Sequence, residues 1–133
     1  KRRVGVTAAC HGDIVYGGSF AVADATVKNI LYSKPEIVTL VAMGLEGKTR
    51  ADEDEQCGLY MRNLLQGRKP DNEAVCSLVI SGEESQKYEN PLYPQWPIED
   101  REMALDIDSH SFALRITKED GYFISRPEKK IIH

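Results

Sequence analysis

The clearest pattern of apolar and polar positions begins at residues 13–20. Ile14, Val15 and Tyr16 predict a buried strand, and two glycines and a serine follow it directly. Apolar residues then recur at helical spacing and predict a helix over 20–32: Phe20, Ala23, Val27, Ile30 and Leu31. A strand that turns through glycines into a helix is typical of the βα corner of an α/β domain, where such domains bind ligands.

Residues 36–43 are β-branched and almost continuously apolar, which predicts a strand covered on both faces. The order strand, helix, strand from 14 to 43 then predicts a βαβ unit with parallel strands and a right-handed crossover. The loop that follows at 44–47 leaves this second strand on the same edge as Gly18 and Ser19.

Further elements follow from the pattern after residue 50. A helix is expected over 51–66, stopped by Gly67, with an apolar face made of Cys57, Met61, Leu64 and Leu65. Asp71 is the expected N-cap of a third helix whose inward residues are Val75, Leu78 and Val79.

The two ends of the chain give weaker patterns. A short helix closed by Gly12 is expected over 1–11, and a packed loop over 86–97. Residues 98–114 indicate helix in two pieces, 103–107 and 109–115, and residues 122–125 a short strand ended by Pro127.

Composition narrows the class of protein. The length of 133 residues predicts one domain, 1–133, and a formal charge of −4 argues against nucleic-acid binding. The longest apolar run, 37–43, is too short to span a membrane. Three cysteines without CxxC spacing favour reduced core residues of a cytoplasmic protein over a catalytic or metal role. The chain starts without Met and in mid-pattern, which favours a piece of a longer polypeptide.

The corner at Gly18 and Ser19 has two interpretations. It is either a tight turn with Ser19 as N-cap, or an anion site in which helix N-terminal amides bind an oxyanion. The acidic run 52–55 likewise has two: acids that stabilise a first helical turn, or ligands of Mg²⁺, which prefers oxygen donors. His110 is interpreted as a surface histidine rather than an acid/base group, and no nucleophile elbow surrounds Ser19.

The order of these segments resembles one family. Residues 15–20, the small-residue helix, residues 38–44, the acids at 52–54 before Cys57-Gly58, and the ending through 106–108 and 122–127 are similar to the C-terminal half of the 2-phosphosulfolactate phosphatase family. The resemblance covers essentially the whole chain and leaves the family's N-terminal half without a counterpart. It departs from the family pattern at Val22, where the family has Asn, and in the order of the acidic pair.

The resemblance implies a three-layer α/β/α sandwich with a mixed, largely parallel sheet. It also implies a Mg²⁺-dependent phosphatase that converts 2-phosphosulfolactate, or a related phosphate monoester, to sulfolactate and phosphate, as in coenzyme M biosynthesis. We expect Gly18 and Ser19 to contact the anion and Glu53 and Asp54 to bind Mg²⁺, with the catalytic nucleophile unassigned.

The expected partners are a small phosphorylated substrate, the family's N-terminal half and a second copy of the chain, with no nucleic acid and no membrane. The alternative is a non-catalytic domain that binds an anion or a partner chain and has an incomplete active site.

Overall fold

A three-stranded antiparallel sheet joins an early strand to a late hairpin. The computed structural model describes residues 12–43, 52–81, 92 and 98–131, without the side chains of 52, 53, 100, 101 and 104. The strands are β1 (Val15–Gly17), β2 (Phe112–Glu119) and β3 (Tyr122–Lys129), in the order β1-β2-β3. The helices are η1 (Phe20–Val22), α2 (Ala23–Tyr32), α3 (Asp52–Leu65), α4 (Asn72–Ser81) and α6 (Ile98–Ala104).

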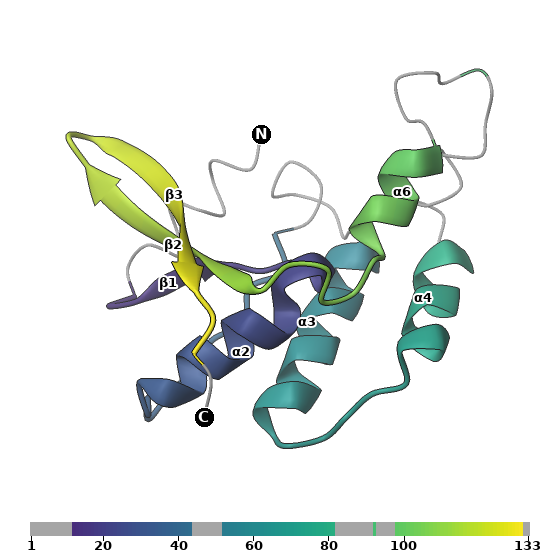
Figure 1. The fold of residues 1–133 in the computed structure, drawn as a ribbon, viewed down its shortest axis with the longest axis horizontal. Helices are drawn as coiled ribbons and strands as arrows, with labels where there is room; N and C mark the ends of the chain where they lie inside the picture. The colour runs from purple at the N-terminus through teal and green to yellow at the C-terminus, as the bar shows by residue number, and fades with distance from the viewer. Residues whose placement is uncertain (1–11, 44–51, 82–91, 93–97, 132–133) are drawn as a thin grey trace.

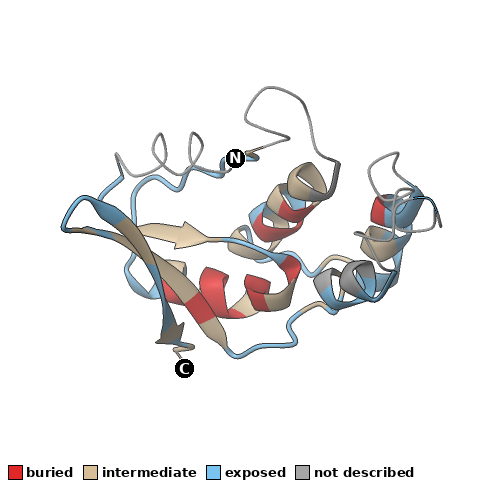
Figure 2. Cartoon of the chain, turned by 90° about the horizontal axis from the view of Figure 1, so that it is seen from above, coloured by how far each residue is buried: buried red, intermediate tan, exposed pale blue. Residues whose placement is uncertain are grey.

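Helices α2, α3 and α4 pack one on another, and the first of them, α2, packs on the sheet. α2 packs against β2, α3 packs on α2, and α4 packs on α3, so α2 separates the sheet from the other helices (Figure 1). Buried residues concentrate on α2 and on the facing part of α3 (Figure 2).

The hydrophobic core lies between η1, α2, α3 and α4. The rings of Phe20 and Tyr60 meet edge to face, with centroids 5.7 Å apart. On the sheet side, the fully buried Ala113 of β2 has the small side chain that a close helix approach needs. The buried core residues are Phe20, Ala23, Val27, Cys57, Tyr60, Met61 and Val79.

Local signals at the ends of α3 and α4 are confirmed. Gly67, at φ 78°, donates to the Leu64 carbonyl at 3.0 Å, and Arg68 donates to the Asn63 carbonyl at 2.8 Å. These two bonds form the Schellman motif that ends α3. The Asp71 carboxylate accepts the backbone N–H of Glu73 at 3.0 Å and so caps α4.

The expected largely parallel three-layer sandwich is wrong. All strand pairs in the described chain are antiparallel, and one sheet packs on one side of α2. The early strand β1 is present, but its partner is β2, with Val15 opposite Ile116. No βαβ unit forms from residues 14–43.

The strand expected over 36–43 is also absent. These residues carry no helix or strand, and Ile37 is 82% exposed. The apolar run predicted a strand, but a strand also needs a neighbouring strand with which its backbone can form hydrogen bonds. Among the described residues, β1 pairs with β2 and with no other strand.

The expected helix over 109–115 is wrong as well, because β2 begins at Phe112 and pairs along its length with β3. Asp120 and Gly121, at φ 50° and 81°, make the two-residue turn between them. An Asp-Gly pair is a strong hairpin signal, and here it overrides the helical propensity of the preceding residues. Pro127 lies inside β3 rather than ending it, which an edge strand tolerates.

Other expectations stand in part. Leu78 is 57% exposed instead of facing inward, whereas Val79 is buried. The segments expected over 1–11 and 44–47, and all but residue 92 of the loop 86–97, lie outside the described residues. Among the described helices, none is long and apolar enough to cross a bilayer.

Gly18 fits closely against α3. A Cβ built on Gly18 would lie 3.0 Å from the Met61 sulfur, so any side chain must displace Met61. We therefore expect Gly18→Val to lower the free energy of unfolding by about 1–3 kcal/mol through overpacking, and Gly18→Ala by less because the Met61 side chain is flexible. Urea unfolding of both variants measures this. The double variant Gly18→Val with Met61→Ala should show coupling, and strictly additive losses would contradict the packing account.

Candidate functional site

Gly18 and Ser19 are exposed at the corner between β1 and η1. Ser19 is the extended N-cap of η1, yet its side chain makes no cap hydrogen bond. Its carbonyl accepts the Val22 N–H at 3.3 Å. The turn is therefore closed by backbone, and the Ser19 hydroxyl is not used as a helix cap.

A loop from the C-terminal part of the chain lies against this corner. The Asp108 N–H donates to the Phe20 carbonyl at 2.9 Å, and the His110 N–H donates to the Ala21 carbonyl at 3.0 Å. Asp108 holds a left-handed conformation with φ 58°, which Asp tolerates better than most residues. The loop thus brings Asp108 and His110 beside the residues that follow Ser19.

The N-terminus of α2 is already capped by a carboxylate. Asp108 Oδ1 accepts the backbone N–H of Asp24 at 2.9 Å, across 84 positions of sequence. A carboxylate at this position interacts favourably with the helix dipole. The role that we expected for a bound anion at this helix start is therefore partly filled by the chain itself.

Asp24 is the centre of a small charge cluster. Its carboxylate pairs with Lys28 at 3.2 Å and with Lys130 at 2.5 Å. Burial pushes the pKa of Asp24 upward, but hydrogen bonds from Lys130 and Lys28 outweigh it, and the net pKa is lowered. The same bond raises the pKa of Lys130. Because these groups are partly exposed, each pair contributes about 0–1 kcal/mol.

The predicted metal residues lie at the start of α3. Asp54 is half-buried, and the Glu53 side chain lies outside the described part. Met61, which approaches Gly18, comes two turns after Asp54, roughly 10 Å further along the helix axis. No described contact joins the acids to the Gly18–Ser19 corner. In the described ranges no group of three or more His, Cys, Asp or Glu could hold a metal ion.

The contacts of His110, Cys57 and Cys76 are those of structural residues. His110 is exposed, and its ring stacks on Phe112 at 5.2 Å. Cys57 is buried and Cys76 half-buried, and neither is in a disulfide. Burial raises the pKa of the Cys76 thiol, which keeps it neutral and a poor nucleophile. His11, His133 and Cys10 lie outside the described residues.

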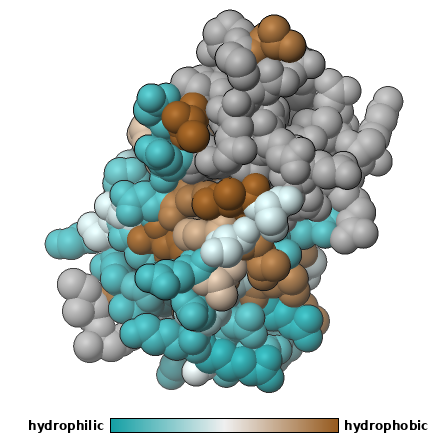
Figure 3. Space-filling view, turned by 90° about the vertical axis from the view of Figure 1, so that its right-hand side faces the viewer, coloured by the Kyte–Doolittle hydropathy of each residue, from teal (hydrophilic) through white to brown (hydrophobic). Residues whose placement is uncertain are grey.

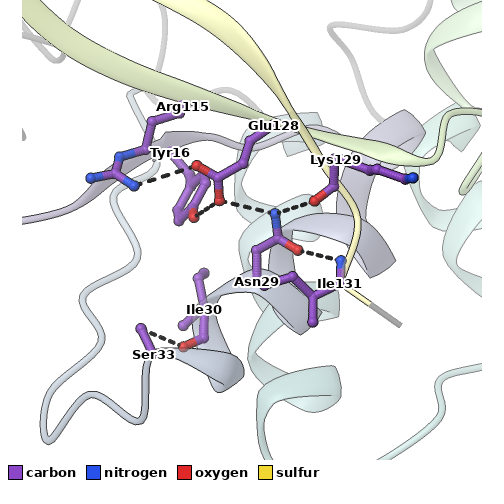
Figure 4. A network of polar contacts seen from close by, with 8 residues as sticks. All are labelled: Tyr16, Asn29, Ile30, Ser33, Arg115, Glu128, Lys129 and Ile131. Carbon is purple, nitrogen blue, oxygen red and sulfur yellow. Dashed lines mark hydrogen bonds and ion pairs between the residues drawn. The ribbon is translucent and has the colours of Figure 1, made fainter. Parts of the chain in front are cut away.

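The most connected polar site is centred on Glu128 (Figure 4). Tyr16 donates its hydroxyl to Glu128 Oε1 at 2.6 Å, and Asn29 donates to the same oxygen at 3.1 Å. Arg115 contacts Glu128 Oε2 at 3.4 Å. These four residues, called the Glu128 network below, join β1, α2, β2 and β3.

Asn29 uses both ends of its amide. Its side chain is almost fully buried, at 2% exposure, and its NH₂ group also donates to the Lys129 carbonyl at 3.2 Å. Its oxygen accepts the Ile131 N–H at 2.9 Å. Asn29 therefore fastens the end of β3 to α2, and its burial is compensated by hydrogen bonds.

Tyr16 is held in its neutral form. Burial is the largest cause that raises its pKa to about 12, followed by the hydrogen bond to Glu128 and its negative charge. Arg115, 5.8 Å from the ring centroid, opposes this shift. A tyrosine with this pKa is a structural hydrogen-bond donor near neutral pH.

Sequence reasoning missed Asp24, Asp108, Asn29 and Glu128. For Asn29 the sequence carried one signal, because its spacing from Ala25 and Thr26 places the three residues on one helical face. The structure shows that all three are buried. A polar residue on such a face indicates a buried hydrogen-bonding role. Glu128 carries no comparable local signal, because its partners come from three other elements.

Comparisons with known proteins give no match to any protein-family model, curated protein or solved structure.

Replacing Asn29 tests its fastening role. Asn29→Leu leaves the Ile131 N–H and the Lys129 carbonyl without this partner, so we expect a loss of about 1–3 kcal/mol in the free energy of unfolding. Asn63→Leu is the control, because the Asn63 side chain only accepts a 3.4 Å bond from Arg68. Urea unfolding with equal losses in both variants would contradict a special role for Asn29.

The raised pKa of Tyr16 predicts a pH dependence. Since the folded pKa of about 12 exceeds the ordinary value of 10.0, this stabilisation is present below pH 10 and is lost as the pH rises through 12. Tyr16→Phe should therefore flatten the decline of stability in this window. Unfolding curves recorded across the window measure it, and an unchanged decline in the variant would contradict the assignment.

Proposed function

We propose that the chain is the C-terminal part of a Mg²⁺-dependent phosphatase located in the cytoplasm. The reaction is hydrolysis of 2-phosphosulfolactate or a related phosphate monoester by water, giving the alcohol and inorganic phosphate. The observation that carries this proposal is the order of motifs along the whole chain, from residues 15–20 to residues 122–127, which resembles that family.

The exposed Gly18–Ser19 corner supports the proposal as a place for phosphate oxygens. It is solvent-accessible, it lies at a helix start, and the Ser19 hydroxyl is not used as a cap. In this role Ser19 and the adjacent backbone would orient the phosphate. Because Asp24 and Asp108 already place two carboxylates nearby, a phosphate at the corner needs further positive charge.

Mg²⁺ would supply that charge by binding phosphate oxygens and polarising the phosphorus centre. Asp54 and Glu53 are its proposed ligands in this chain. They do not form a complete site within the described residues, so the proposal requires ligands from the family's N-terminal half, acting as a partner polypeptide.

The alternative function is a non-catalytic domain that binds a partner chain. The capped start of α2 favours it, because Asp108 occupies the place where a phosphate would interact best with the helix. The charge-balanced cluster around Asp24 favours it for the same reason.

Phosphate release separates the two functions. The chain is assayed alone and mixed with the N-terminal half of a member of the resembled family, against 2-phosphosulfolactate and a simple aryl phosphate, with Mg²⁺ or with a chelator. Mg²⁺-dependent release supports the phosphatase. Absence of release in every mixture would overturn it and favour the partner-binding domain.

A pair of matched variants tests the metal assignment. Asp54→Asn should lower Mg²⁺-dependent release by at least about tenfold, because it removes a proposed ligand. Glu73→Gln, an exposed acid in the first turn of α4, should leave release unchanged. Equal effects of the two substitutions would indicate that Asp54 only stabilises its helix.

A further inference from the structure

Helix α4 is apolar on the side that faces water as well as on the side that faces the core. Val79 belongs to the buried core, and Val75 packs against that core. On the outer side, Leu78 is 57% exposed and Ile80 is 41% exposed. Because a helix that is apolar all round is normally buried, the outer side of α4 has the composition of a surface that another molecule covers.

Helix α6 lies next to α4 and exposes apolar side chains as well. The Cys76 thiol of α4 donates to the Leu105 carbonyl at 3.6 Å, and Leu105 directly follows α6. Figure 3 views the side of the molecule that carries both helices, and apolar side chains gather in the middle of this face. An exposed apolar patch of this kind marks an interaction site. We call it the α4–α6 surface, and its exposed apolar residues are Leu78, Ile80, Ile98 and Met103.

The charged side chains on these two helices are acidic. Glu99 and Glu102 of α6 are exposed, and their spacing places them on the same helical face as the two apolar residues of α6. Glu73 is exposed in the first turn of α4. No described cation forms an ion pair with any of these three carboxylates. The α4–α6 surface therefore combines apolar contact area with negative charge that is open to a partner.

The sequence separates charge in the same way. Residues 71–108, which contain both helices, include ten acidic and two basic residues, a net charge of −8 against −4 for the whole chain. A second copy would bring the same negative charge to a symmetric contact, so repulsion opposes that occupant. The described helices of this chain are neutral or acidic, so a basic helix has to come from another protein.

The backbone of the α4–α6 surface limits how a partner can bind. Its residues belong to helices, whose N–H and C=O groups bond within the helix, so a partner strand has no free edge with which to pair. Side chains must therefore make the contact. An amphipathic helix with lysine or arginine beside its apolar stripe meets both the apolar and the acidic part of the surface.

We propose that the α4–α6 surface is the docking site for a basic amphipathic helix of another protein. The apolar stripe of that helix covers Leu78, Ile80 and Met103. Its basic side chains pair with Glu99 and Glu102, where charge complementarity selects the partner and speeds its association. The proposal uses no residue of the Gly18–Ser19 corner and is independent of the phosphatase activity.

The first experiment titrates the full chain into two labelled model peptides of about 18 residues, followed by fluorescence anisotropy. Both peptides form helices with the same leucine stripe, and the residues beside the stripe are lysine in one and glutamate in the other. We expect the lysine peptide to bind at least about tenfold more tightly, and its affinity to fall as salt is raised. Equal affinities, or no binding of either peptide, would overturn the proposal.

Matched variants locate the binding site. Leu78→Gln should weaken binding of the lysine peptide by about 5- to 30-fold, because it removes an apolar contact. Val41→Gln is the control, because Val41 is 54% exposed and lies outside the α4–α6 surface. Circular dichroism checks that both variants keep the wild-type fold. If Val41→Gln weakens binding as much as Leu78→Gln does, the peptide binds elsewhere and the proposed site is wrong.

A second pair of variants tests the acidic residues. The double variant Glu99→Gln with Glu102→Gln should make binding of the lysine peptide weaker and less dependent on salt. Glu36→Gln, which replaces an exposed acid outside the surface, should leave both unchanged. Sedimentation of the wild type without peptide tests the other occupant. A dimer that Leu78→Gln dissociates would show that a second copy covers the surface, and the proposal would fail.

Discussion

The hydrogen bonds of Glu128 are the constraint on which the arrangement of the described chain depends. Tyr16 and Glu128 are 112 positions apart, yet their 2.6 Å bond joins the first strand to the last. Asn29 of α2 donates a hydrogen bond to the same carboxylate and another to the Lys129 carbonyl at the end of β3. The Glu128 side chain is 34% exposed, so these donors fix the direction of a partly exposed carboxylate. One site thus sets how the sheet sits on α2.

From this constraint the positions of the other elements follow. With α2 against the sheet, its opposite face and η1 bury Phe20 and Val27 against α3, and α4 completes that core through Val79. The loop that leads into β2 must cross the start of α2, and Asp108 caps the helix there. The corner proposed for phosphate is therefore also a structural junction, which explains why both charge and glycine are found at it.

Local signals in the sequence were sufficient for several elements. The Asp71 cap, the Gly67 stop and the apolar face of α3 need only contacts within a few residues, and all three are confirmed. The Asp120-Gly121 turn is equally local, because an Asp-Gly pair by itself favours a two-residue hairpin turn. For the candidate site, the sequence predicted that Gly18 and Ser19 contact an anion, whereas their exposure and their neighbours Asp24 and Asp108 are known only from the fold.

What the sequence by itself determined is the C-terminus of α3, the N-terminus of α4 and the apolar face of α3, because glycine conformation, capping and apolar periodicity act within one or two helical turns. Only the tertiary structure decided which strands pair. Residues 36–43 have the local properties of a strand but form none. In contrast, β2 has weaker local properties and is a strand because β1 and β3 lie on its two sides. Strand formation depends on the neighbouring strands as much as on the segment, since every ladder hydrogen bond has its second partner on another strand.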